Sequence, residues 1–284
     1  MKARQLAGSV PAPLIFVGSG FFQYSGAALA VTLFSVLGPG PTTWWRLLVG
    51  ALTLMVLWRP WRQKWTRQDL LGSALFGITL GLMNLLFYEA IARIPLGAAV
   101  SVEFLGPVAI AVFRGRGVPP RLAALLALVG IALIGGWGLD LSAPGVLTGV
   151  LFALGAALMW AGYILLGQAI AQRRSGVNSL AVGCLTAAVV FTPFLAPAAL
   201  AVEFTGPVIL AILGVGIFST AIPYSLEAIA FRRLTPAVFA LLTALLPATS
   251  TLIGALALRQ IPTPGELVGL LFVSVAVWLA SRVT

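Results

Sequence analysis

Long apolar stretches alternate with short groups of charged and turn-forming residues along the whole chain. A helix of about 20 apolar residues is long enough to cross the hydrocarbon core of a bilayer, which is about 30 Å thick. Breaking the chain at charges, Pro and Gly predicts ten such spans, at residues 12–34, 40–58, 69–92, 96–113, 119–137, 145–170, 176–197, 206–230, 236–258 and 263–282. The connections between them are short, so we expect a compact bundle of helices without a soluble domain.

The composition agrees with a membrane protein. Of the 284 residues, 60% are hydrophobic and 8% are charged, against about 25% charged in ordinary soluble domains. The mean hydropathy of +1.07 therefore excludes a soluble enzyme. An isoelectric point near 11.3 suggests nucleic-acid binding, but the basic residues stand between apolar runs rather than on one surface. We expect the lipid bilayer as a partner, and no nucleic acid.

The first apolar stretch follows Lys2 and Arg4 and so resembles a secretory signal. It runs for about twenty residues, longer than the apolar region of a signal peptide, and similar stretches follow it. We interpret it as a retained first helix. Cys184 is the one cysteine, so no intramolecular disulfide can form, and the chain has no histidine. We expect no metal and no cofactor.

The basic residues indicate the direction in which the chain crosses the membrane. With the N-terminus inside, the outer loops hold Arg93 and Arg259, and Arg46 lies within the second span. The other fourteen basic residues fall on the inner side: Lys2, Arg4, Arg59, Arg62, Lys64, Arg67, Arg114, Arg116, Arg121, Arg173, Arg174, Arg232, Arg233 and Arg282. This asymmetry follows the positive-inside rule and predicts that both termini are cytoplasmic.

A short internal repeat relates the two halves of the chain. The motif Glu-Ala-Ile-Ala at 89–92 recurs at 227–230, 138 positions later, and Pro107 and Pro247 match at an offset of 140. Both offsets shift the chain by five helices, and an odd number of helices per repeat reverses the direction of the second half. We therefore predict a first repeat at 1–138 and an inverted second repeat at 139–284, as in many secondary transporters. Duplication in a protein that no longer transports, or chance similarity, is the alternative.

Several polar side chains are expected at membrane depth, where an unsatisfied polar group is costly and normally faces the bundle interior or a water-filled path. Asn84 and Tyr88 lie four residues apart and so share a helix face, while Trp160 and Tyr163 offer an aromatic wall. We predict that the substrate-binding residues are Gln23, Asn84, Tyr88, Ser101, Glu103, Trp160, Tyr163, Ser219 and Tyr224. Satisfied packing between helices is the alternative for each of them.

Two opposite charges are expected at similar depths. Arg46 lies roughly 7 Å and Glu103 roughly 10 Å inside the outer boundary, at 1.5 Å per helical residue. We predict a buried ion pair between the second and fourth spans that a zwitterionic substrate, or a proton on Glu103, breaks during transport. In the alternative, Arg46 snorkels to the outer interface and Glu103 stays protonated. Pro107, Pro223 and Pro247 are expected to kink their helices around a cavity.

No signature of enzyme chemistry is present. The chain lacks HExxH, paired aspartates at metal spacing, a nucleophile with a base and a P-loop. A carrier driven by gradients is therefore favoured. A channel is the alternative, but no charged ring or filter motif supports it.

Three stretches resemble the drug/metabolite transporter superfamily, specifically its bacterial ten-helix EamA-type exporters. They are GLMNLLFYEAIARIPLGAAVSVEFLGPVAIAVF at 81–113, ALGAALMWAGYILLGQ at 153–168 and STAIPYSLEAIAFRRLTPAVFALLTALLPA at 219–248. Among these exporters the chain looks most like the threonine/homoserine exporters, with aromatic amino acid exporters as near relatives.

The resemblance implies an all-α polytopic membrane protein of ten transmembrane helices in two inverted five-helix repeats. It also implies a bacterial inner-membrane exporter of amino acids such as threonine, homoserine, methionine or tryptophan, working by alternating access. It places Asn84, Tyr88, Ser101 and Glu103 on one wall, facing Trp160, Tyr163, Ser219 and Tyr224. We expect a monomer. The alternatives are a metabolite or nucleotide-sugar exchanger and a non-transporting membrane protein.

Overall fold

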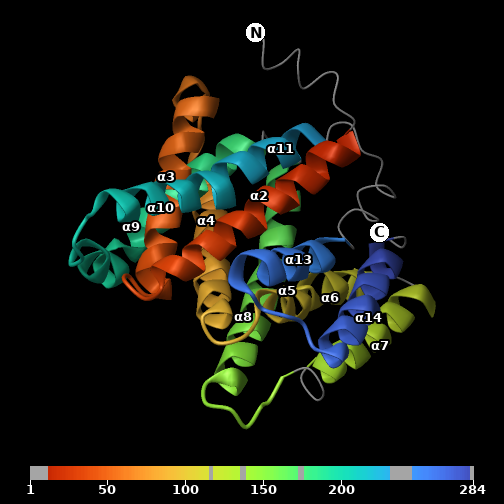
Figure 1. Ribbon diagram of the computed structural model, residues 1–284. Helices are drawn as coiled ribbons and strands as arrows, with labels where there is room; N and C mark the ends of the chain where they lie inside the picture. The colour runs from red at the N-terminus through yellow and green to blue at the C-terminus, as the bar shows by residue number, and fades with distance from the viewer. Residues whose placement is uncertain (1–11, 115–117, 135–138, 172–175, 231–244, 282–284) are drawn as a thin grey trace.

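The computed structural model describes residues 12–114, 118–134, 139–171, 176–230 and 245–281, and within these ranges it consists of helices and their connections (Figure 1). The helices are α2 (Ala12–Leu33), α3 (Pro39–Trp58), η1 (Pro60–Arg62), α4 (Arg67–Ile91), α5 (Leu96–Glu103), α6 (Leu105–Arg114), α7 (Val118–Leu133), α8 (Val146–Ala171), α9 (Gly176–Leu200), α10 (Gly206–Gly216), η3 (Ile217–Ala221), α11 (Ile222–Ala230), α13 (Leu246–Leu258) and α14 (Pro264–Ser281).

The observed helices coincide with the predicted spans to within a few residues. The fourth span is divided into α5 and α6, and the eighth into α10, η3 and α11. The first part of the ninth predicted span, residues 236–244, lies outside the described residues. Among the described residues, four helices are both long and apolar enough to cross a membrane: Arg67–Ile91, Val146–Ile170, Gly176–Leu200 and the helix that runs over Gly206–Leu226.

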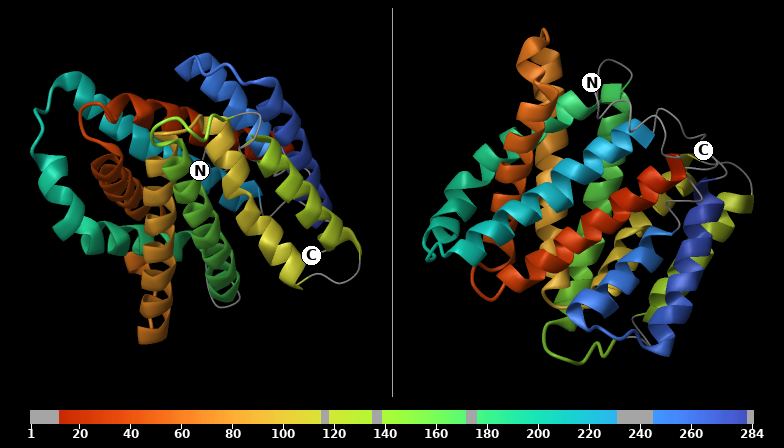
Figure 2. Two further views of the ribbon diagram at one scale, coloured as in Figure 1. Left: turned by 90° about the horizontal axis from the view of Figure 1, so that it is seen from below. Right: turned by 45° about the horizontal axis from the view of Figure 1, so that its top comes forward.

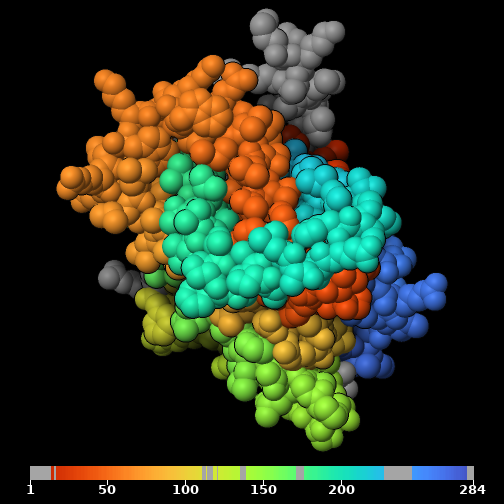
Figure 3. Space-filling model, turned by 90° about the vertical axis from the view of Figure 1, so that its left-hand side faces the viewer, coloured from red at the N-terminus to blue at the C-terminus, as the bar shows by residue number. Residues whose placement is uncertain are grey.

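Large apolar side chains cover the outside of the bundle. On the face shown in Figure 3, α9 and α10 lie over α3. Phe194 of α9 is 78% exposed and Leu210 of α10 is 71% exposed. Many exposed leucines, valines and phenylalanines continue this surface on the other helices. A soluble monomer rarely exposes such a continuous apolar surface, so the protein is a multi-pass membrane protein whose outer side chains face lipid.

Prolines accompany both interruptions. Pro107 cannot donate the helical hydrogen bond to the carbonyl of Glu103, and α5 ends at Glu103. Pro223 likewise cannot donate to the carbonyl of Ser219, which lies in the π-helix η3. Pro247 stands in the first turn of α13, a position that proline tolerates well.

The helices pack in pairs that repeat between the two halves (Figure 2). We number the helical segments in chain order, with α5 and α6 as segment 4, α10 to α11 as segment 8, α13 as segment 9 and α14 as segment 10. Segment 3 packs on segments 6 and 7, and segment 8 packs on segments 1 and 2. Segment 4 packs on segment 6, and segment 9 packs on segment 1. Segments 2 and 7, 4 and 9, and 5 and 10 also contact each other, so a shift of five segments leaves this pattern unchanged.

Glycine allows the closest of these approaches. A Cβ atom at Gly77 of α4 would lie only 2.0 Å from the carbonyl oxygen of Gly183 in α9. Small residues are common where membrane helices touch, because they let the backbones come together. The crossing of α4 and α9 therefore depends on glycine on both helices.

Candidate functional site

The buried Arg46 side chain connects α3 to the π-helix. It is 2% exposed. Its Nε donates a hydrogen bond to Oγ1 of Thr220 at 3.2 Å, and its Nη2 donates one to the carbonyl oxygen of Ser219 at 3.0 Å. The guanidinium carbon also lies 5.1 Å from the centroid of the Tyr88 ring, a cation–π contact. Three helices, α3, α4 and η3, thus meet at one positive charge.

The sequence explains why the Ser219 carbonyl is available to Arg46. In an α-helix this carbonyl would accept from the backbone nitrogen four residues later, which here belongs to Pro223 and carries no hydrogen. The π-helix over Ile217–Ala221 widens the backbone at the same place. Such single-turn π-helices are often found at functional sites.

Two hydroxyl groups beside Arg46 lack hydrogen-bond partners. The Tyr88 hydroxyl and Oγ of Ser219 are both fully buried, and neither is bonded by a residue that the structure describes. Each is a buried polar group of the kind that is normally satisfied in a folded protein. These two atoms and the guanidinium leave hydrogen-bonding capacity unused in the interior.

Glu103 does not form the predicted direct ion pair with Arg46. Within the described ranges the one salt bridge shorter than 4 Å joins Glu89 and Arg93, at 2.5 Å. Glu103 is 8% exposed and interacts with Arg46 through the electrostatic field over a longer distance. The prediction of a contact was wrong because depth along two helices fixes the height of a side chain and not the direction in which it points. Arg46 turns instead toward η3.

The aromatic side chains predicted to form a wall pair with other rings. Trp160 of α8 meets Phe104 edge to face, with ring centroids 4.7 Å apart. Tyr163 stacks on Phe76 of α4 at 4.5 Å. Phe34, at the end of α2, lies 5.5 Å from the ring of Tyr88. Trp160 and Tyr163 therefore both face inward, and each makes its own aromatic contact.

Ser101 lies apart from Arg46. Its hydroxyl donates to the carbonyl of Gly97 at 2.8 Å. It lines a cavity of about 20 Å³ together with Thr251, Gln260 and Glu266, which is enough room for one water molecule. The structure therefore does not bring Ser101 to the charge cluster.

Three other predicted residues lie in or beside the same interior. Asn84 is buried and donates from Nδ2 to the carbonyl of Leu80 at 2.9 Å. Gln23 of α2 and Tyr224 of α11 are half-buried. Among the residues predicted to bind substrate, those that the structure places in direct contact with the Arg46 guanidinium are Tyr88 and Ser219.

Two features were not predicted. Glu266 caps α14 through Thr263 but is only 8% exposed, and its Oε1 has no partner in the described chain. The spacing of Thr263 and Glu266 indicates the capping box, while the burial of Glu266 under α5 could not be read from that spacing.

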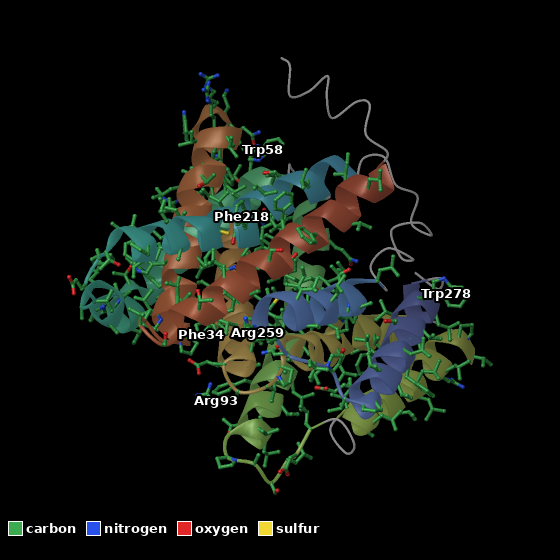
Figure 4. The ribbon with its side chains drawn as sticks, in the orientation of Figure 1. Phe34, Trp58, Arg93, Phe218, Arg259 and Trp278 are labelled. Carbon is green, nitrogen blue, oxygen red and sulfur yellow. The ribbon has the colours of Figure 1, made fainter. Side chains whose placement is uncertain are left out.

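A hollow of about 460 Å³ also opens at the end of the bundle that carries Arg93. Its lining includes Phe34, which Figure 4 shows at the same end as Arg93 and Arg259.

The described residues contain no cluster of three or more His, Cys, Asp or Glu side chains that could hold a metal ion. The polar chemistry of the interior around Arg46 is therefore that of one guanidinium, one carboxyl group and several hydroxyl groups.

Comparison with known proteins identifies the relatives. The threonine/homoserine exporter RhtA of Escherichia coli strain K12 is 38% identical over 261 residues, which cover 92% of this chain and 88% of the relative. The threonine/homoserine exporter RhtA of Salmonella typhimurium strain LT2 is 36% identical over 269 residues, covering 95% and 90%. Residues 147–282 match the EamA-like transporter family. The chain belongs to the EamA-like transporter family.

Membership in this family confirms the resemblance noted in the sequence and makes the protein a membrane transporter rather than an enzyme. A protein of solved crystal structure, 23% identical, superposes with a TM-score of 0.60 and covers 95% of this chain and 96% of its own. That likeness extends the shared fold beyond the matched second half to nearly the whole chain.

Proposed function

We propose that the protein exports amino acids across the bacterial inner membrane. The relatives that cover most of the chain are named threonine/homoserine exporters. The observation that carries the proposal is the buried cluster of Arg46, Tyr88 and Ser219, in which no residue of the described chain bonds the Tyr88 hydroxyl or Oγ of Ser219. A small zwitterion with hydrogen-bonding groups matches this unused capacity. Neutral and aromatic amino acids, among them threonine, homoserine, methionine and tryptophan, are the substrates that we propose, with related metabolites.

The transport mechanism that we propose is alternating access between two inverted halves, 1–138 and 139–284. The repeated pairing of segments in the two halves supports it, because an approximate twofold relation produces such a pattern. The halves meet around the Arg46 cluster, to which α3 and α4 contribute from the first half and η3 from the second. Rocking of one half against the other would open this cluster to each side in turn. Both termini face the cytoplasm in this proposal, and the protein acts as a monomer.

An exit path toward the outer side is supported by the hollow near Arg93. Phe34 lines this hollow, and the same ring contacts Tyr88. The aromatic pair of Phe34 and Tyr88 therefore lies between the hollow and Arg46. Substrate released at the cluster would pass Phe34 on the way out.

A metabolite or nucleotide-sugar exchanger is the second candidate within the superfamily. Phosphorylated substrates carry several negative charges and need several basic groups. Arg46 is the one buried basic residue in the part of the chain that the structure describes, so a substrate with a single carboxylate fits the interior better.

Flux through proteoliposomes tests the proposal. The pure protein is reconstituted, and the movement of labelled threonine, methionine and tryptophan is followed with and without an imposed proton gradient. Saturable flux is expected, and the response to the gradient tells whether transport is coupled to protons. Absence of flux for all three amino acids, with flux of a nucleotide sugar or another metabolite, would contradict the proposal.

A further inference from the structure

The Arg46 guanidinium uses one edge of its planar fork and leaves the other edge free. Arginine has five N–H donors in a fixed plane. Nε and Nη2 stand on one edge, and both donate to η3, to Thr220 and to the Ser219 carbonyl. The opposite edge is formed by Nη1 and the second hydrogen of Nη2. No residue in the described part of the chain accepts a hydrogen bond from Nη1.

The free edge is held in a fixed direction. Two hydrogen bonds fix the plane of the guanidinium, and the Tyr88 ring covers it at 5.1 Å. A donor pair that is already oriented loses little conformational entropy when a ligand binds. Two parallel N–H groups at this spacing match the two oxygens of a carboxylate.

The charge balance also calls for an anion at this edge. A buried guanidinium is costly unless a negative group pairs with it. Glu103 does not come within 4 Å of Arg46, although the two groups interact electrostatically. The Arg46 charge therefore has no anionic partner within contact distance in the described part of the chain. The α-carboxylate of an amino acid supplies such an anion.

We propose that Arg46 binds the α-carboxylate of the substrate through its free edge. This assignment rests on the proposed function and deepens it. The site then selects compounds that carry a carboxylate, while amines and amides lack this contact.

Substrate analogues test the assignment on the unchanged protein. Efflux of labelled threonine from proteoliposomes is measured against unlabelled threonine, threonine amide and 3-hydroxybutyrate as competitors. The amide replaces the carboxylate, whereas the hydroxy acid keeps the carboxylate and removes the ammonium group. The amide is expected to inhibit at least about tenfold more weakly than threonine, the range expected for losing hydrogen bonds to a charged group, and more weakly than the hydroxy acid. Equal inhibition by threonine and its amide would overturn the role of Arg46 and leave amino acid export intact.

A variant then assigns the effect to Arg46. Arg46→Lys keeps the positive charge and removes the two-pronged edge. The affinity of this variant for threonine should fall at least about tenfold, while its affinity for threonine amide stays the same. Threonine and threonine amide should then inhibit efflux equally. Arg62→Lys, an exposed arginine of η1, is the matched control and should keep the full difference. An Arg46→Lys protein that still discriminates like the wild type would contradict the assignment. Absence of all threonine flux in the wild type would instead contradict the proposed function itself.

Discussion

The Tyr88 hydroxyl is buried in the interior, and no residue in the described ranges bonds it. An unsatisfied buried hydroxyl costs about 1–3 kcal/mol, so Tyr88→Phe should leave the protein as stable as the wild type or more so. Transport at low substrate concentration should fall roughly tenfold, because the variant loses a charge-assisted hydrogen bond to the substrate. Initial efflux rates and thermal unfolding of the same preparation measure the two effects.

Ser73 provides the control for Tyr88. Its Oγ is also buried without a partner in the described chain, and it lies on the same helix, α4. Fifteen residues separate it from Tyr88, about 22 Å along the helix. Ser73→Ala should therefore leave the efflux rate unchanged. An equal loss in both variants would show that removing any buried hydroxyl from α4 disturbs transport.

Trp160 is half-buried beside Phe104, the residue that follows Glu103. Trp160→Ala removes the large ring of a residue that the sequence predicts to bind substrate, and we expect export to fall about tenfold while the helices stay folded. Trp61, 58% exposed in η1, is the matched control, and Trp61→Ala should transport normally. Efflux and circular dichroism test both variants. Wild-type export by the Trp160 variant would remove this residue from the site.

At the scale of elements, the crossing of α4 and α9 makes a paired prediction. A Cβ at Gly77 would lie 2.0 Å from the Gly183 carbonyl oxygen, whereas nothing lies within 4 Å of a Cβ at Gly72. Gly77→Ala should destabilise the protein by about 1–3 kcal/mol through overpacking. Gly72→Ala should stabilise it by about 0.5–1 kcal/mol, the helical preference for Ala. Thermal unfolding in detergent compares them, and equal melting temperatures would contradict the close approach of these two helices.

The helices themselves could be predicted from sequence, because apolar length and the position of charges determine where a chain can cross a bilayer. The observed bounds lie within a few residues of the predicted ones from Ala12–Leu33 to Pro264–Ser281, except in the ninth span, whose first part lies outside the described residues. The position of Arg46 within an apolar stretch could also be read from the sequence, whereas its burial could not, because the same position allows the side chain to snorkel to the outer interface.

The contacts of the site could be predicted only in part. Ser101 and Glu103 stand two residues apart on α5, which turns their side chains about 200° from each other. This spacing alone indicates that Ser101 and Glu103 do not line the same wall of a cavity. The π-helix at Ile217–Ala221 could not be predicted in this way, since the one signal for it in the sequence is Pro223, two residues after its end. The bond from Arg46 to the Ser219 carbonyl depends on that local widening and on the packing of α3.

At the scale of the whole molecule, the two inverted halves that we propose make a prediction about which connections lie on which side of the membrane. The connection between α3 and α4 lies at one end of the bundle and the connection before α8 lies at the other (Figure 1). Fourteen of the seventeen basic residues fall on the side predicted to be cytoplasmic, which is the side of the α3–α4 connection. Cys184 is buried and is the one cysteine of the chain, so Cys184→Ala gives a background in which single cysteines can be placed.

Three exposed positions then report the two sides. In intact cells a membrane-impermeant maleimide should label Ser142→Cys and Glu203→Cys, in the predicted outer connections, and should label Gln63→Cys only after the cells are permeabilised. Ser142 follows the fifth segment and Gln63 the second, so their opposite labelling requires an odd number of crossings between them. Labelling of Gln63→Cys and Ser142→Cys from the same side would exclude the proposed orientation of the first half. The same result would also exclude the inverted repeat on which alternating access depends. An inverted repeat requires an odd number of crossings in the first half, before the second half begins beside Ser142.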